Sequence, residues 1–287
     1  MRGRLGVTFP EHRDRRYFSL DGYRAILARA LALDYRIVAF REFARPAGQP
    51  VMLLRHDLDG PLAGAHAMAE LEAEAGVRAT YFVQTAGDFY NLLSRASRAF
   101  LRRLAALGHE IGLHYEAQRY RDDAGAVGRD LRLLEDLAGQ PVRSASQHIP
   151  VDDDPIEMER HVENEAYAPR FTQDPMTYIS DSLMAWRDAT PHELLDRGAS
   201  FQLLVHPETW IGGYRDMGEA LRGMMAEEIE AVTARYRDVG AYYAALLGQR
   251  AERDRAFRAR RARPRGERKR REPPPAHRRP DRHAVPA

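Results

Sequence analysis

The chain has 287 residues, of which 44% are hydrophobic, and it contains no cysteine. That length suits one or two domains and is enough for a single large α/β barrel. The absence of cysteine excludes a disulfide framework and thiolate metal ligands, and it fits a reducing compartment. The N-terminal residues lack the apolar stretch of a secretory signal, and no run of roughly 18 apolar residues occurs. We therefore expect a cytoplasmic protein without a membrane span.

The net charge of +2 is unevenly distributed along the chain. Residues 250–287 hold 15 Lys/Arg and 5 Asp/Glu, so about +10 lies there and about −8 on the remainder. We expect this basic, Pro-rich tail to be disordered, because it has few apolar residues to offset its ordering entropy. It could contact an anionic partner. No Phe, Trp or Tyr stands among the arginines of residues 259–283, so a base-stacking platform is absent and nucleic acid is not the expected ligand of the body.

The body of the chain alternates short apolar runs with amphipathic stretches, which is typical of βα units around a parallel sheet. A first helix is expected over 19–31, with Ser19 or Asp21 near its N-cap. Strands are expected over 51–57, 79–83, 110–114, 142–148, 177–180 and 201–205. Further helices are expected over 62–75, 94–107, 122–138, 191–197 and 217–247. Residues 151–175 are expected to form a long loop, either functional or disordered.

Acidic or imidazole side chains follow five of the predicted strands. In chain order they are Asp57 and Asp59, His114, His148, Asp181, and His206. Because the carboxyl ends of parallel strands share one edge of a sheet, these side chains are expected to converge on a site. His56 alternates to the opposite face of its strand, so we expect it to pack or to support the site from behind. His66, on the following helix, is expected at the surface or in the core.

Asp59 and His114 are donors suited to a divalent ion, with Zn²⁺ first among the candidates. Asp57 lies two residues before Asp59, so both carboxylates could point the same way from an extended segment. A free carboxylate beside a bound metal ion is placed to act as general base. The alternative is that Asp57-Leu-Asp59-Gly60 is a turn whose aspartates cap the next helix.

These segments resemble a known family. Gly108-His-Glu-Ile-Gly-Leu-His114 matches a motif of the polysaccharide deacetylases (the NodB-like carbohydrate esterases of family four) at every fixed position. Arg55-His-Asp-Leu-Asp-Gly60 resembles a variant of their first motif, and Leu203-Leu-Val-His-Pro207 resembles a late one. The resemblance runs from about Val51 to Trp210. It is nearest to a divergent intracellular branch that is linked to the synthesis of bacterial surface polysaccharides.

The resemblance implies a distorted, incomplete (β/α) barrel. It also implies that Asp57 is the general base, that Asp59 and His114 bind the metal ion, and that His206 is the general acid that protonates the departing amine. Asp181 and Trp186 resemble residues that line the acetyl pocket in relatives, and Trp210 could have the same role. Burial of either tryptophan in the core is the alternative.

The sequence departs from the family pattern at one expected metal ligand. The second histidine of the family's His-x-x-x-His falls at position 118, where this chain has Gln118, a poor zinc ligand that could instead contact substrate. We expect His148 to replace it; the alternative is a weak or empty site. The family's arginine-bearing third motif would fall near Ser146 to Pro150, and no arginine stands there.

We therefore predict a catalytic domain over 1–248, followed by the basic tail over 249–287. The predicted reaction is metal-dependent removal of an N-acetyl group from an amino sugar, and the expected substrate is a nucleotide sugar, a lipid-linked precursor or an unfinished glycan. Two alternatives stay open. One is an amidase that acts on a small cyclic amide, and the other is a carbohydrate-binding protein with a degenerate site.

Overall fold

In the computed structural model, residues 18–46, 48–121, 123, 125–150, 157–186 and 188–262 are described. The chain divides into two compact units, Met1–Glu228 and Ile229–Ala287. The first unit holds the sheet, the helices around it and all of the candidate site residues. The second contains the larger part of one long helix. The division into a domain over 1–248 and a tail over 249–287 stays a prediction.

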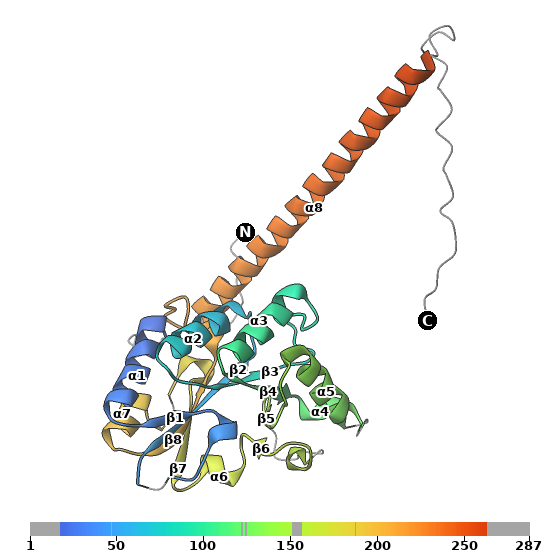
Figure 1. The fold of residues 1–287 in the computed structure, drawn as a ribbon. Coiled ribbons are helices and arrows are strands. Elements are labelled where there is room, and N and C mark those ends of the chain that lie inside the picture. The colour runs from blue at the N-terminus through green and yellow to red at the C-terminus, as the bar shows by residue number, and fades with distance from the viewer. Residues whose placement is uncertain are drawn as a thin grey trace, which may run out of the picture. The chain divides into compact units, whose positions relative to one another are not determined.

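The first unit is built on one sheet whose strand pairings are all parallel (Figure 1). The order is β6-β5-β4-β3-β2-β8-β7, and β1 pairs with the start of β2. The sheet curves into a half-barrel that stays open between β6 and β7, as expected for a distorted, incomplete (β/α) barrel. The strands are β1 Arg36–Val38, β2 Val51–Leu58, β3 Thr80–Val83, β4 Glu110–Tyr115, β5 Ser144–Gln147, β6 Asn164–Glu165, β7 Met176–Ser180 and β8 Ser200–Val205.

Helices connect the strands and cover the outside of the half-barrel. They are α1 Leu20–Ala32, α2 Ala63–Glu74, α3 Arg95–Ala106, α4 Ala117–Tyr120, α5 Ala126–Ala138, α6 Pro169–Thr172 and α7 Pro191–Asp196, and a further helix, α8 Met217–Ala262, follows the last strand. The predicted first helix is confirmed, and Ser19 caps it by accepting a hydrogen bond from the amide of Gly22 at 3.0 Å. The segments β1, β6, α4 and α6 were not predicted, because pieces of two to four residues show no periodicity.

The central strand β2 has two faces with different partners. Val51 and Leu53 point into the half-barrel and belong to an apolar cluster with Phe40, Phe82 and Phe171. Because side chains alternate along a strand, Arg55 and Asp57 continue the same face toward the carboxyl end. The interior face of β2 is therefore apolar at the start of the strand and polar at its carboxyl end, and the site lies at that polar end.

The opposite face of β2 carries His56 into a buried polar network. The Glu72 carboxylate of α2 contacts His56 Nε2 at 2.6 Å and accepts hydrogen bonds from the hydroxyls of Tyr23 at 2.5 Å and Tyr81 at 2.8 Å. His109 Nδ1 lies 3.5 Å from the same carboxylate. All five side chains are fully buried. His56 thus packs behind the strand, as its alternation predicted, and joins the sheet to the helices.

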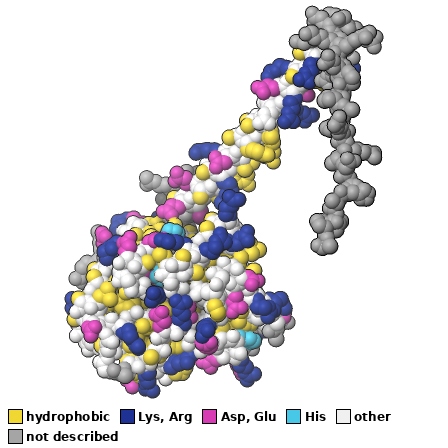
Figure 2. All heavy atoms as spheres, in the orientation of Figure 1, with side chains coloured by type: hydrophobic (Ala, Val, Ile, Leu, Met, Phe, Trp, Pro, Cys, Tyr) yellow, Lys and Arg dark blue, Asp and Glu magenta, His cyan; other side chains and the backbone are white. Residues whose placement is uncertain are grey.

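The second unit is described as far as Ala262, and within it α8 is one uninterrupted helix. The helix runs beyond Leu247, where the sequence predicted its end. Figure 2 shows hydrophobic side chains along the middle of α8 and basic side chains, all of them arginine, toward its described end. The predicted disorder of the tail is wrong for residues 249–262, which belong to this helix, and the tail residues from 263 onward lie outside the described ones. Among the described helices, none is long and apolar enough to cross a membrane.

Candidate active site

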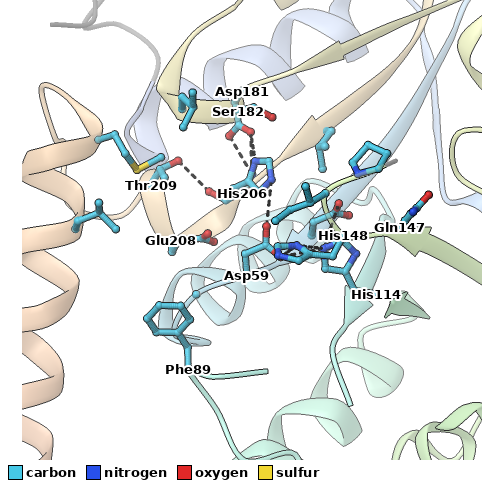
Figure 3. A pocket seen from close by; sticks show the side chains of 18 of the residues that line it. Asp59, Phe89, His114, Gln147, His148, Asp181, Ser182, His206, Glu208 and Thr209 are labelled. Carbon is cyan, nitrogen blue, oxygen red and sulfur yellow. Dashed lines mark hydrogen bonds and ion pairs between the residues drawn. The ribbon is translucent and has the colours of Figure 1, made fainter. Parts of the chain in front are cut away.

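The five strand ends meet at one cavity of about 380 Å³, as their order along a parallel sheet predicts. That volume lies within the range of small-molecule sites. Six of the residues that the sequence singled out line it, namely Asp57, Asp59, His114, His148, Asp181 and His206. Figure 3 shows most of these side chains directed toward a common centre.

Three donor atoms form a group that could hold a metal ion: Asp59 Oδ1, His114 Nε2 and His148 Nδ1. Asp59 Oδ1 lies 2.9 Å from His114 Nε2 and 3.2 Å from His148 Nδ1, and the two imidazole nitrogens are 3.1 Å apart (Figure 3). Ligands of a tetrahedral Zn²⁺ ion with bonds of about 2.0–2.1 Å stand about 3.3 Å from one another. The spacing and chemistry of the donors therefore fit such an ion.

Neighbouring groups orient two of these donors. His114 Nδ1 lies 2.9 Å from the Ser146 carbonyl oxygen, so this nitrogen carries the proton and Nε2 keeps a free lone pair. The Gln84 amide donates a hydrogen bond to Asp59 Oδ1 at 3.0 Å. Burial raises the pKa of the Asp59 carboxyl, but its contacts with His114 and His148 outweigh burial and hold the pKa well below its ordinary value. Asp59 is thus an ionised carboxylate at neutral pH.

Asp57 is held by a buried arginine from its own strand. Arg55 Nε and Nη2 donate to the two carboxylate oxygens of Asp57 at 2.9 and 2.7 Å. The guanidinium also donates to Gln202 Oε1 and to the Tyr167 hydroxyl, both at 3.0 Å, and to the hydroxyl of Ser146. Burial raises the pKa of Asp57, yet the charge of Arg55 brings it below its ordinary value. Asp57 therefore stays ionised beside the donor group.

His206 faces the same centre from β8 and is fixed from behind by Asp181. Its Nδ1 lies 2.5 Å from Asp181 Oδ1, and the Trp210 indole donates to Asp181 Oδ2 at 2.6 Å. His206 Nε2 is left toward the cavity, 3.6 Å from Asp59 Oδ2. Burial lowers the pKa of His206, but the Asp181 carboxylate outweighs it and raises the pKa well above its ordinary value. The imidazole is therefore cationic at neutral pH.

A further carboxyl, that of Glu208, lines the cavity although the sequence did not point to it. It lies against Gly60, where a Cβ atom would stand 2.7 Å from Glu208 Cγ. The missing side chain of Gly60 thus makes room for Glu208 beside Asp59. Burial raises the pKa of Glu208 to about 8, with His206 acting in the opposite direction.

Three of the predicted substrate-binding residues lie outside the cavity lining. Gln118 is exposed on α4, and Trp186 packs against Phe18 and Trp210. Trp210 is fully buried and contacts Asp181. The cavity does contain Asp181, but its carboxylate is occupied by His206 and Trp210. Direct contact of these four residues with substrate stays a prediction.

Sequence reasoning missed Arg55 and Gln84, although signals for both were present. Gln84 follows the strand Thr80–Val83, so the strand-end rule that found the other residues applies to it as well. Arg55 precedes Asp57 by two residues on an extended segment, and that spacing places both on one face. No arginine stands within Ser146 to Pro150, and the arginine that contacts Asp57 comes from β2.

No protein-family model matches the sequence, and no curated protein matches it. Solved structures that match it are CE4 family polysaccharide deacetylases at low identity. A CE4 family pseudoenzyme from Bacillus anthracis is 13% identical, covers 67% of this chain and 66% of its own, and has a TM-score of 0.37. IcaB from Ammonifex degensii is 18% identical over 53% of this chain and 76% of its own, with a TM-score of 0.40. The peptidoglycan deacetylase PdaC from Bacillus subtilis is 13% identical over 63% and 85%, with a TM-score of 0.40. These are proteins to which the chain is similar, and they are of the kind that its motifs resemble.

Proposed function

We propose that the first unit is a metal-dependent hydrolase that removes an N-acetyl group from an amino sugar or a glycan precursor. The observation that carries the proposal is the arrangement within one cavity of three metal-suited donors, an ionised carboxylate and a cationic imidazole. The motifs shared with polysaccharide deacetylases support the choice of an acetamido substrate. His148 supports a functional site, since its Nδ1 lies with the Asp59 and His114 donors while Gln118 is exposed.

Asp59, His114 and His148 would hold the ion, with Zn²⁺ the expected one. A divalent ion supplies Lewis acidity toward water and an amide carbonyl. The Asp57 carboxylate is placed to accept a proton from the attacking water. Its oxygens are kept in place by Arg55, and its lowered pKa keeps it deprotonated at neutral pH.

His206 acts on the leaving group of the reaction. Its Nδ1–H is held by Asp181, so its Nε2–H is free to donate a proton to the departing nitrogen. The carbon–nitrogen bond of the acetamido group breaks, and a C–O bond to the water oxygen replaces it. One proton of the water passes to Asp57, and the proton of His206 passes to the amine. The products are acetate and an amino sugar.

The full chain, stripped with a chelator and reloaded with Zn²⁺, tests the proposal. We expect about one ion per chain by elemental analysis, and release of acetate from N-acetylglucosamine or its oligomers. Asp59→Ala should lose both the ion and the activity. His66→Ala is the matched control, because His66 is an exposed imidazole on α2 outside the cavity lining. A chain that recruits no divalent ion and is unaffected by Asp59→Ala would rule the hydrolase out.

A further inference from the structure

The candidate cavity has a polar floor and an apolar mouth. Three large hydrophobic residues that line it are exposed, with Phe89 at 46%, Ile149 at 71% and Leu183 at 67%. The first turns of α8 add Met217, Leu221 and Met224 to the lining. Exposed apolar side chains that gather at a cavity are typical of a binding surface for an apolar group.

The backbone at two of these residues is strained. Ile149 has a φ of +49° and Leu183 a φ of +59°, both in the left-handed region. Glycine and asparagine adopt this region readily, whereas a β-branched residue such as isoleucine is an outlier there. Because both side chains are exposed, burial does not explain why large aliphatic residues occupy these positions. Strain of this kind concentrates at ligand sites.

The charge of the lining argues against an anionic group in the substrate. Among the described residues that line the cavity there is no lysine or arginine, whereas four are acidic, namely Asp57, Asp59, Asp181 and Glu208. The diphosphate of a nucleotide sugar is usually bound by arginine or lysine. Among the described lining residues it would find neither, although the His206 imidazole there is cationic.

We propose that the substrate is an N-acetylated amino sugar whose aglycone is apolar and uncharged, and that the aglycone contacts Phe89, Ile149 and Leu183. This inference rests on the proposed deacetylase function and replaces the nucleotide sugar as the expected substrate. The apolar mouth lies next to the reacting groups, because Ile149 follows His148 and Leu183 stands two residues after Asp181.

The test compares three substrates with the zinc-loaded full chain: the methyl and octyl glycosides of N-acetylglucosamine, and the uridine diphosphate sugar. Each methylene buried is worth roughly fourfold in affinity, so burial of two raises kcat/KM for the octyl glycoside by roughly fifteenfold over the methyl glycoside. The nucleotide sugar should be the poorest substrate. Equal kcat/KM for the two glycosides, or a preference for the nucleotide sugar, would overturn this inference and leave the deacetylase intact.

Leu183→Asn and Ile149→Asn sharpen the test, since asparagine tolerates a positive φ and the variants should fold. Each should bring the octyl-to-methyl ratio toward one. Leu93→Asn is the control, because Leu93 is 57% exposed and lies outside the cavity lining. If no acetamido compound is hydrolysed, the proposed function fails, and calorimetric binding of the two glycosides then decides the inference. Equal affinities would refute it.

The second unit supports a separate inference. Every residue of α8 from Ala226 to Arg261 is exposed. Large apolar side chains recur on it at alternating steps of three and four residues, namely Ile229, Val232, Tyr236, Val239, Tyr243 and Leu246. This is the a/d spacing of a coiled coil, in which each side chain packs between four residues of a facing helix. An exposed helix also gains no packing energy, although packing is the main source of helix stability.

The charges along α8 indicate which partner this stripe accepts. Residues 229–247 carry two arginines and two acidic residues, so the striped segment does not repel a copy of itself. Residues 248–262 carry six arginines and two acidic residues. Two parallel copies would bring these basic ends together, whereas two antiparallel copies keep them apart. We infer that α8 pairs with α8 of a second copy of this chain in an antiparallel coiled coil.

The chain contains no cysteine, so pairs of single-cysteine variants report the arrangement directly. In an antiparallel pair centred on the stripe, Ile229 of one copy faces Leu246 of the other. A mixture of Ile229→Cys and Leu246→Cys should form a disulfide-linked dimer on mild oxidation, whereas each variant alone, and the outward-facing Ala234→Cys, should not. Linkage of each variant with itself would show a parallel pair, and a monomer by light scattering of the full chain would exclude self-association. Either result overturns the inference.

Discussion

Replacement of Arg55 by methionine would leave the Asp57 carboxylate buried without its charged partner. The guanidinium is fully buried, the Asp57 side chain is 3% exposed, and two hydrogen bonds of 2.9 and 2.7 Å join them. Two charges about 4 Å apart in an effective dielectric of about 20 attract each other by about 4 kcal/mol. Removal of one partner of a buried pair typically costs about 3–5 kcal/mol. We therefore expect Arg55→Met to lower the free energy of unfolding by about 3–5 kcal/mol.

The double variant Arg55→Met/Asp57→Leu distinguishes the loss of the buried charge pair from a simple packing defect. That variant removes both charges, so it should recover most of the stability that Arg55→Met loses. Urea unfolding at neutral pH, with a chelator present to remove any contribution from bound metal, measures all three proteins. A loss below about 1 kcal/mol for Arg55→Met, or a double variant no more stable than the single one, would refute this account of the pair.

Three further predictions concern the other groups of the cavity. His148→Ala should abolish retention of Zn²⁺ on gel filtration, because it removes one of three donors; full stoichiometry in this variant would mean that the ion binds elsewhere. Asp181→Asn should lower the pKa of His206, so the alkaline limb of the kcat/KM profile should move to lower pH, and an unchanged limb would exclude His206 as the acid. Glu208 has a pKa raised to about 8 in the folded metal-free protein, so its neutral form favours folding at low pH and this stability is lost as pH rises toward 8. Glu208→Gln should therefore flatten the fall in melting temperature between pH 6 and pH 8.5 in chelator; a fall as steep as that of the unaltered chain would contradict it.

The sequence could predict that the side chains after several strands meet in one site, because this follows from the parallel topology of the sheet alone. Parallel strands place their carboxyl ends at one edge, so polar residues after several strands must meet there. The position of His148 beside Asp59 and His114 was also within reach of the sequence, and the structure gives its physical basis. β5 pairs with β4 so that Ser146 stands opposite His114, and the residue two positions later reaches the same centre. The chain after β4 turns into α4, where Gln118 faces solvent.

Other features depended on three-dimensional packing and could not be predicted from sequence patterns. Glu208 reaches the cavity only because Gly60 has no side chain, and a contact between residues so distant in sequence leaves no periodic signal. The Glu72 network likewise depends on packing, because it joins α1, α2, two strands and the residue before a third, His109, and none of these segments by itself indicates the contact. The sequence predicts too early an end for α8 because the last turns of this helix are as rich in arginine as the basic tail that follows.

The backbone around His148 has a consequence for how fast an ion could leave the cavity. Asp59 follows the central strand of the sheet and His114 lies within β4, whereas His148 comes after the last residue of β5. Its amide donates to the Tyr115 carbonyl at 2.7 Å, and the next residue has a strained conformation. Opening of this short segment would remove one donor without breaking the sheet. We therefore expect dissociation of the ion to proceed by local opening, with a rate that depends only weakly on urea, while global unfolding is much slower and depends on urea steeply.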